Sequence, residues 1–387
     1  MLYISICIFL LYLSFLYDIV GLKKYKKEMS VVSLMVLISF SGFRYHLGGD
    51  TFGYIYRFYN HEYPLLDSYT WENFEFGNDP LFALLNSLVF YFGGKFYIFQ
   101  FVHAIILNFL LFIYFKRHCT YIFTCMFFYF LFCFFHYNTE ILRGSMSIVI
   151  CLFGNDYIIK KKWIKGYLLY FIALNFHIQT VLLLLTPLMF NIKFNFKGYL
   201  FLFISFLLIY YFQGSLIDYT EFLNVDENLE KRSELYLTSE VYGSTKKITS
   251  GFILGVTPII YVLGSLKYLK KNHSISDMSS IEPFIFLGIF FFIISILIPI
   301  VYRYQDYYTI YFILVLSEFF VVYARKFQGL LGYRFIRSLV VFVPLFLTIA
   351  VRIWANDRYF PYTDIFQKEI VLEREKLYNG VIRPDQY

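Results

Sequence analysis

Four clusters of polar residues lie beside long apolar stretches and hold the side chains best suited to chemistry. They are Arg44, Asp50, Thr51 and Tyr54; Asn138, Glu140 and Arg143; Asn175 and His177; and Arg303 with Asp306. Guanidinium groups bind phosphate oxygens bidentately and stay charged at every relevant pH. Histidine or aspartate can take a proton from an attacking hydroxyl. These residue types predict a site for a polyanionic, lipid-linked ligand.

The composition places these clusters in a membrane protein. The chain has 387 residues, of which 59% are apolar and 16% charged, and its mean hydropathy is +0.59. Soluble domains are about 45–50% apolar and about 25% charged. Too few polar groups remain to cover a soluble surface, which excludes a soluble globular enzyme, a disordered protein and a secreted disulfide scaffold. We expect an all-α polytopic membrane protein, with residues 1–387 forming one integral membrane domain.

Ten stretches are apolar enough to be predicted as membrane-spanning helices. They cover residues 2–20, 29–43, 96–115, 121–137, 141–159, 198–212, 251–268, 282–301, 307–324 and 338–354. Two further segments are ambiguous. Residues 78–93 are apolar but short, whereas residues 166–190 are long and carry His177 near their middle.

The basic residues decide how these two segments are interpreted, because cytoplasmic loops carry an excess of Lys and Arg. Suppose that 78–93 does not cross and that 166–190 is a hairpin of two short helices turning at His177. Every basic cluster then falls on the cytoplasmic side. With both segments as full spans, the clusters at 116–117 and 160–162 would lie outside. We therefore predict the hairpin, and with it all four polar clusters at the outer face.

This topology leaves two large outer loops, at residues 44–77 and 213–250, and both are acidic on balance. The second loop is the candidate for a lid over the site. The net charge of +7 follows mostly from the basic residues of the cytoplasmic side. No nucleic-acid partner is therefore expected.

Several motifs follow one another in a recognisable order. They are Arg44-Tyr45-x-x-Gly48-x-Asp50-Thr51-x-x-Tyr54, Arg143-Gly144, the helix pair around His177, Arg303-x-x-Asp306-Tyr307-Tyr308 and Pro361-Tyr362. The pattern resembles the EpsG-like membrane proteins, a branch of the Wzy polysaccharide polymerases, over nearly the whole chain. The chain departs from it by an extra glycine, so that Gly48 or Gly49 matches, and by Ser145 where a glutamine is expected.

The resemblance implies a GT-C-like glycosyltransferase of about 10–12 transmembrane helices. It would lie in the bacterial cytoplasmic (inner) membrane with its active site facing outside. A growing glycan on undecaprenyl pyrophosphate would be transferred onto a new lipid-linked repeat unit, giving O-antigen of lipopolysaccharide, capsule or exopolysaccharide. The implied partners are these lipid-linked oligosaccharides, membrane lipid and a chain-length regulator protein. No cofactor or metal is implied, and the sequence has no DxD motif.

The resemblance also assigns roles to the polar residues. His177 and Asp50 are the candidate catalytic bases. The candidate substrate-binding residues are Arg44, Thr51, Tyr54, Arg143, Arg303 and Asp306. The three arginines would hold the pyrophosphates of donor and acceptor, since a leaving pyrophosphate needs positive charge as its bond breaks.

Structural interpretations stand beside these functional ones in the first two clusters. Arg44 ends a predicted span and could be a snorkelling residue at the membrane interface. Asp50 could cap the helix that starts at Thr51, a common use of aspartate. Arg143 could pair with Glu140 at helical spacing.

The other candidates have ordinary interpretations too. His177 could be a satisfied core histidine, and Thr51 and Tyr54 could be surface residues. Arg303 and Asp306 could pair with each other, since they are three residues apart on a predicted helix.

Three rival functions follow from the same residue types. A glycolipid flippase should show internal repeats and polar residues along a path through both leaflets, whereas these clusters lie at one predicted face. A membrane O-acyltransferase should show matching polar groups toward the cytoplasm. An O-antigen ligase would use the same donor, and only the resemblance favours a polymerase over it.

Overall fold

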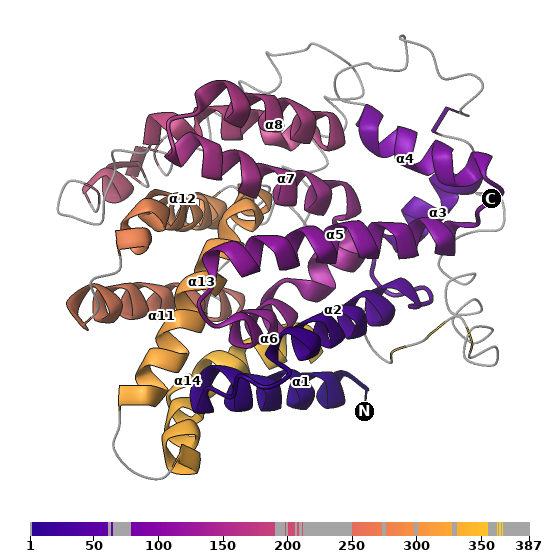
Figure 1. Ribbon diagram of the computed structural model, residues 1–387. Coiled ribbons are helices and arrows are strands. Elements are labelled where there is room, and N and C mark those ends of the chain that lie inside the picture. Colours follow the sequence, from indigo (N-terminus) through magenta and orange to yellow (C-terminus); the bar gives the residue numbers. More distant parts are fainter. Residues whose placement is uncertain are drawn as a thin grey trace. The chain divides into compact units, whose positions relative to one another are not determined.

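The fold is all-α, as predicted, in every part of the chain that the computed structural model describes (Figure 1). The described residues are 2–60, 63–64, 79–189, 198, 200–205, 207–208, 211, 250–272, 276–297, 301–326, 331–354, 362, 364 and 366. Within these ranges the only β-type pairing is an isolated bridge between Arg44 and Asp364. The predicted lid at 213–250 lies outside the described residues, apart from Ser250.

The helices fall into two compact units, and most of the candidate residues belong to the first. The first unit comprises Met1–Leu184 and Phe320–Tyr387, and the second Leu185–Phe319. The first contains α1 (Leu2–Leu13), η1 (Ser14–Val20), α2 (Lys26–Gly42), α3 (Thr51–Tyr59), α4 (Pro80–Tyr91), α5 (Phe96–His118), α6 (Ile122–Phe132), η4 (His136–Glu140), α7 (Leu142–Ile159), α8 (Trp163–Phe176) and α14 (Leu331–Trp354). The second contains α11 (Ser250–Asn272), α12 (Ser276–Leu297) and most of α13 (Tyr302–Lys326), while η5 (Ile178–Met189) runs from the first unit into the second.

The long helices confirm a polytopic membrane protein. Among the described residues, five helical stretches are long and apolar enough to cross a membrane, and all five overlap predicted spans: Leu2–Val20, Phe96–His118, Leu142–Ile159, Tyr302–Lys326 and Gly332–Ala350. Four other predicted spans lie on α2, α6, α11 and α12. The twelve residues of α4 rise only about 18 Å, well short of a hydrocarbon core of about 30 Å. The length of α4 therefore supports the prediction that residues 78–93 do not cross.

The predicted hairpin at His177 is confirmed. Helix α8 ends one residue before His177, η5 begins one residue after it, and His177 itself is extended (φ −161°, ψ 122°). Across the turn, the Thr180 hydroxyl donates to the Ala173 carbonyl at 3.5 Å, and the Tyr167 hydroxyl donates to the Leu184 carbonyl at 3.5 Å. Contacts between residues progressively farther from His177 mean that the chain runs back along α8.

Close packing of α7 on α8 depends on glycine. A Cβ added at Gly154 would lie 2.9 Å from the ring of Tyr170, and one added at Gly166 would lie 2.3 Å from Ile158. Small residues allow two helix backbones to approach, as is common in membrane bundles. The start of α7 and the end of α8 therefore lie side by side.

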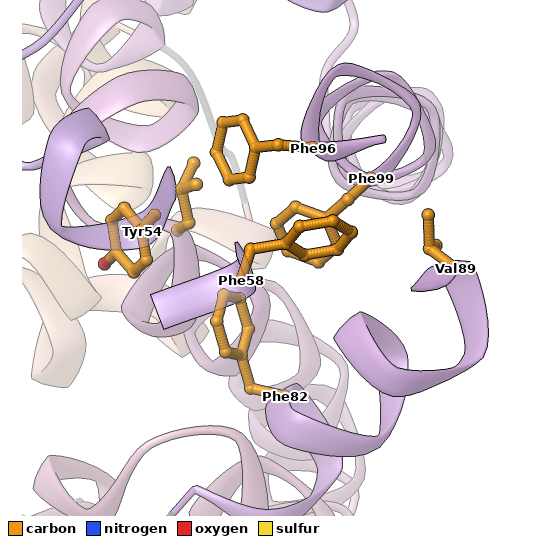
Figure 2. Packing of buried hydrophobic residues seen from close by; sticks show 7 residues of the cluster. Tyr54, Phe58, Phe82, Val89, Phe96 and Phe99 are labelled. Atoms are coloured by element: carbon orange, nitrogen blue, oxygen red, sulfur yellow. The ribbon is translucent and has the colours of Figure 1, made fainter. Parts of the chain in front are cut away.

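An aromatic cluster joins the short helices α3 and α4 to α5 (Figure 2). Its buried members are Tyr54, Phe58, Phe82, Val89, Phe96, Phe99 and Leu142. Phe82 and Phe99 meet edge to face, with ring centroids 5.4 Å apart and an interplanar angle of 89°. Each such pair is worth about 0.5–1.5 kcal/mol beyond the burial of its area. Because Leu142 begins α7 and Phe82 lies in the first turn of α4, the cluster also fixes the neighbours of both, Arg143 and Asp79.

Candidate functional site

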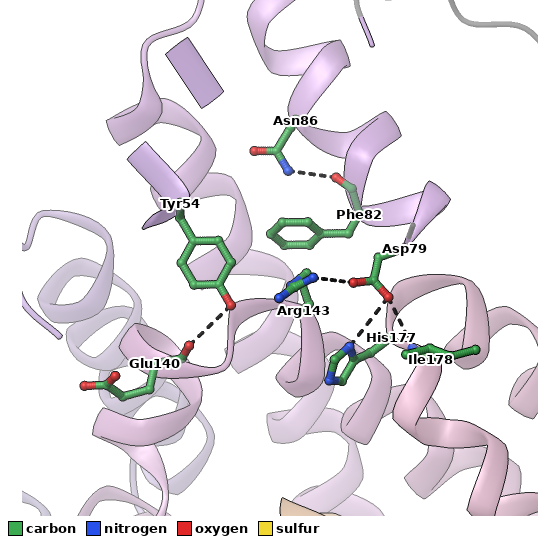
Figure 3. Close-up of polar contacts among 8 residues, drawn as sticks. All are labelled: Tyr54, Asp79, Phe82, Asn86, Glu140, Arg143, His177 and Ile178. Atoms are coloured by element: carbon green, nitrogen blue, oxygen red, sulfur yellow. Dashed lines mark hydrogen bonds and ion pairs between the residues drawn. The ribbon is translucent and has the colours of Figure 1, made fainter. Parts of the chain in front are cut away.

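A buried carboxylate, that of Asp79, connects two of the candidate residues (Figure 3). Its Oδ2 accepts a hydrogen bond from Arg143 Nη1 at 2.6 Å. Its Oδ1 lies 3.5 Å from His177 Nδ1 and accepts the backbone N–H of Ile178 at 3.2 Å. Residues from three separate parts of the chain therefore meet at one aspartate.

The backbone at Asp79 aims this carboxylate away from its own helix. Asp79 occupies the N-cap position of α4, with Pro80 at the first helical position, yet its side chain makes no capping hydrogen bond. Its backbone is left-handed (φ 49°, ψ 57°), a conformation that only a few per cent of non-glycine residues adopt. The side chain of Asp79 is 2% exposed. Asp79 thus contacts Arg143 and His177 and does not cap its helix, although aspartate is well suited to capping.

The charge of Asp79 is maintained by its partners. Burial alone would raise the pKa of this carboxyl group. The nearby His177 ring and the positive charge of Arg143 outweigh burial, and the pKa of Asp79 is lowered from its ordinary value. Asp79 is therefore an anion at neutral pH, and it counters the charge of Arg143.

Arg143 is the second residue of α7, where the helix dipole disfavours a cation. Its side chain is 30% exposed, and its guanidinium lies 6.0 Å from the centre of the Tyr54 ring. The alternative interpretation, a pair between Arg143 and Glu140, is not what the structure shows, because Arg143 pairs with Asp79. The Nε of Arg143 is buried and has no hydrogen-bond partner in the described structure, so a ligand can reach this residue only through the exposed part of its side chain.

His177 is held by the main chain on both sides of the hairpin turn. Its N–H donates to the Ala173 carbonyl at 3.0 Å, and its own carbonyl accepts the N–H of Thr180 at 3.1 Å. The ring is 16% exposed. Because Asp79 faces Nδ1, the proton of a neutral ring belongs on that nitrogen, which leaves Nε2 as the acceptor.

Glu140 organises the loop that precedes α3. Its Oε1 accepts the N–H of Gly49 at 2.8 Å and its Oε2 that of Asp50 at 3.3 Å, which satisfies donors at the start of the helix. The predicted capping by the Asp50 side chain is wrong, since that side chain makes no capping hydrogen bond to α3. Asp50 is exposed at the helix start.

Gly48 is the glycine of this loop that the fold requires. It has φ +97°, and an added Cβ would lie 2.6 Å from Thr139. A side chain at Gly48 would therefore be strained and would also clash. Of the two glycines in the first motif, Gly48 supplies the conformation, and Gly49 supplies an N–H to Glu140.

The interpretation of Thr51 and Tyr54 as surface residues is wrong. Thr51 is fully buried and Tyr54 nearly so. The Thr51 hydroxyl donates to the Leu47 carbonyl, and the Tyr54 hydroxyl donates to the Glu140 carbonyl at 3.3 Å. Both hydroxyls support the loop, and the ring of Tyr54 also forms one wall beside Arg143.

Arg44 is buried, with 2% of its surface exposed, so its interpretation as a snorkelling residue is wrong. Its Nη1 donates to the Ser41 carbonyl, while Nε and Nη2 have no partner among the described residues. Burial lowers the pKa of Arg44 to about 9, against the opposing influence of Tyr362 and Glu140. A buried cation with unused donors is costly unless a negative charge compensates it.

Tyr362, the described half of the last motif, lies near Arg44. Its ring stacks on Phe40 with centroids 4.5 Å apart, and its hydroxyl donates to the Phe40 carbonyl at 3.0 Å. Two residues on, Asp364 forms the isolated bridge to Arg44. The first and last motifs of the sequence are therefore neighbours in the first unit.

Arg303 and Asp306 lie in the second unit, in the first two turns of α13. Asp306 is buried and Arg303 is partly exposed. Tyr308, which follows them, is buried and its hydroxyl lies 3.1 Å from that of Thr186. The roles predicted for Arg303 and Asp306 thus belong to a different unit from Arg143 and His177.

Sequence reasoning missed Asp79, which lies just beyond the outer loop predicted at residues 44–77. An available signal was its place directly before Pro80 and an apolar helix too short to cross. Glu140 was noted, but its hydrogen bonds to a loop 91 residues away were not. Within the described ranges, no three His, Cys, Asp or Glu residues are grouped so that they could hold a metal ion.

Comparison with known proteins agrees with the order of motifs. The EpsG family matches residues 27–363, which is most of the chain. Neither the curated proteins nor the solved structures gave a match. At the level of the family, the match supports a polysaccharide polymerase of glycosyltransferase type. The chain therefore belongs to the EpsG family.

Proposed function

We propose that this protein polymerises lipid-linked oligosaccharide repeats at the outer face of the bacterial cytoplasmic membrane. The donor is the growing glycan on undecaprenyl pyrophosphate, and the acceptor is the next lipid-linked repeat unit. Family membership supports the polymerase, and the basic loops of the sequence support the orientation. The substrate follows from the chemistry of arginine, which suits a pyrophosphate.

The reaction needs one proton acceptor and positive charge at the leaving group. A hydroxyl of the acceptor sugar attacks the anomeric carbon of the donor's reducing-end sugar, and its proton passes to His177 Nε2. The bond from that carbon to the pyrophosphate oxygen breaks, and undecaprenyl pyrophosphate leaves with the electron pair. Arginine stabilises the negative charge that develops on this group.

The observation that carries the proposal is the shared contact of Arg143 and His177 with Asp79. A phosphate-binding cation and a proton acceptor are thereby held side by side, and both are partly exposed. A glycosyl transfer from a pyrophosphate needs these two groups close together. Arg44 supports the same chemistry, since two of its nitrogens lack partners in the described structure.

Of the two predicted bases, His177 is better supported than Asp50. The ring of His177 is oriented by a carboxylate at Nδ1, the arrangement that prepares the other nitrogen to accept a proton. Asp50 is exposed and contributes its backbone N–H to Glu140. Metal independence is part of the proposal, with arginines supplying the charge that a divalent cation would supply elsewhere. Arg303 and Asp306 stay predicted substrate contacts.

The test is the length of the glycan. The gene is deleted, and the lipid-linked and surface polysaccharides are resolved by gel after complementation with the wild type, Arg143→Ala or His177→Gln. We expect single repeat units in the deletion strain, a full ladder with the wild type, and no ladder with either variant at equal membrane abundance. An unchanged ladder with loss of surface display would indicate a ligase or flippase, and loss of acylation alone would indicate an acyltransferase.

A further inference from the structure

We infer that Asp79 is a positioning residue for glycosyl transfer, which fixes His177 as the base and Arg143 as the cation beside it. This inference rests on the proposed function and adds a residue that the family motifs of the sequence do not include. Each carboxylate oxygen of Asp79 has its own partners, and His177 keeps its Nε2 for the substrate.

The two oxygens of Asp79 serve different partners. Oδ2 receives the short hydrogen bond from Arg143, and Oδ1 receives the N–H of Ile178 and faces Nδ1 of His177. The backbone bond to Ile178 also ties Asp79 to the residue that starts η5. One carboxylate thus sets the orientation of a helix start, a turn and an imidazole ring.

Helix capping does not account for Asp79. Its side chain caps nothing in α4, and its left-handed backbone is a conformation in which strain of about 1–3 kcal/mol is typical. Such strain persists where the surroundings require it, and it clusters at functional sites. Here the conformation directs the carboxylate of Asp79 to Arg143 and His177 and not to the N–H groups of its own helix.

The substitution Asp79→Asn separates the two functions of the carboxylate. An amide has one acceptor oxygen, whereas three donors converge on Asp79. If that oxygen keeps the bond to Arg143, the amide N–H₂ faces His177 Nδ1. The ring must then accept at Nδ1 and carry its proton on Nε2, so it can no longer take a proton from the acceptor hydroxyl. Binding by Arg143 survives, and the proton transfer does not.

The experiment uses the purified full-length protein and the lipid-linked repeat units that accumulate in the deletion strain. For Asp79→Asn we expect kcat to fall about 100-fold, the scale of a misplaced catalytic group, with KM little changed. In a His177→Gln background the same substitution should cost little more, because both changes then remove one proton transfer.

The matched control is Asp156→Asn, which breaks a similar aspartate–histidine pair at the other end of α7. It should keep the wild-type kcat. Wild-type kcat in Asp79→Asn would overturn the inference, and so would equal losses in the two variants. If Asp79→Asn does not reach the membrane, Asp79→Glu replaces it. The longer side chain keeps the charge but shifts the carboxylate, so we expect a lower kcat, and an unchanged kcat would overturn the inference.

The role of Asp79 can be disproved while the proposed function still holds. If Asp79→Asn is fully active while Arg143→Ala and His177→Gln are inactive, only the role of Asp79 is wrong. If all three variants polymerise normally, the proposed site itself is wrong.

Discussion

Each end of α7 carries a charge whose sign the helix dipole disfavours, and the two are balanced in different ways. Arg143 lies in the first turn and Asp156 in the last, about 20 Å apart along the axis. Arg143 is paired with Asp79, and Asp156 accepts a bond from His118 Nε2 at 2.9 Å. Both ends therefore hold an aspartate and a histidine, and this similarity makes the differences informative.

At the Asp156 end the pair joins two regular helices. His118 is the last residue of α5, and its ring packs on Tyr114 with centroids 4.4 Å apart. The Nε2 of His118 is occupied by the carboxylate. This geometry fastens α5 to α7 and leaves that nitrogen unavailable to a substrate.

At the Asp79 end the carboxylate comes from a strained position outside any helix and serves three donors. It contacts His177 through Nδ1, which leaves Nε2 clear of this carboxylate, and the side chain of Arg143 is partly exposed. An acid–histidine pair alone therefore does not indicate catalysis. A candidate site is distinguished by hydrogen-bond donors and acceptors that a ligand can reach and that the protein's own contacts do not occupy.

The largest effect should come from Arg143→Ala. Removing one preorganised charge from a developing anion typically costs about 10²–10³-fold in rate, so the polymer ladder should disappear. Arg143→Lys should restore only part of it, because lysine offers a point charge and not a bidentate fork. The rate of repeat addition measures both, with membrane abundance as the control. A normal ladder from Arg143→Ala would contradict the assignment of function to the Arg143 end of α7 and of structure to the Asp156 end.

Gly48→Ala should be the next most damaging change. The added methyl group meets Thr139, and the backbone of Gly48 is in the left-handed region, so we expect a loss of about 1–3 kcal/mol in stability. Loss of the loop geometry should lower activity as well. Gly53→Ala, which has open space around its Cβ on α3, is the matched control. Thermal unfolding in detergent measures both, and equal melting temperatures would contradict the role given to Gly48.

A smaller effect is expected from Asp156→Asn. The substitution should lower stability by about 1 kcal/mol, the typical net value of one hydrogen bond, and leave polymer length unchanged. Thermal unfolding and the glycan gel report the two properties separately. A shortened ladder from a variant of normal stability would mean that the His118 end also takes part in function.

The smallest effect concerns pH. The pKa of Asp79 is lowered in the folded protein, so its contribution to stability is complete above the ordinary value of 3.8. It is lost as the pH falls from there through the folded pKa, and each unit of lowering is worth about 1.4 kcal/mol. The melting temperature of the wild type should therefore fall more steeply below that pH than that of Asp79→Asn. Parallel curves would mean that the partners of Asp79 do not lower its pKa in the folded protein.

Local patterns predicted the elements of the site well. The basic loops and the polar residue within an apolar run indicated the hairpin at His177, and the contacts across its turn confirm it. The start of α3 at Thr51 was also expected and observed. Such features depend on residues close in the sequence, where periodicity and turn chemistry operate.

Partners distant in the sequence were not predicted. Asp79 and Arg143 are 64 residues apart, and Gly49 and Glu140 are 91 apart. Only the packing of α3, α4 and α7 around the aromatic cluster brings them together. For this reason the only partner that sequence spacing offered Arg143, as an alternative to a functional role, was the nearby Glu140, which in the structure is occupied by the loop before α3.

The most direct test of the central claim is reconstitution. The purified full-length protein is supplied with lipid-linked repeat units extracted from the deletion strain, and polymer length and free undecaprenyl pyrophosphate are measured together. We predict that the wild type and Asp156→Asn release one undecaprenyl pyrophosphate for each repeat added. Arg143→Ala should neither lengthen the polymer nor release undecaprenyl pyrophosphate. Polymer growth by Arg143→Ala at the wild-type rate, or no growth by folded wild-type protein, would contradict the account.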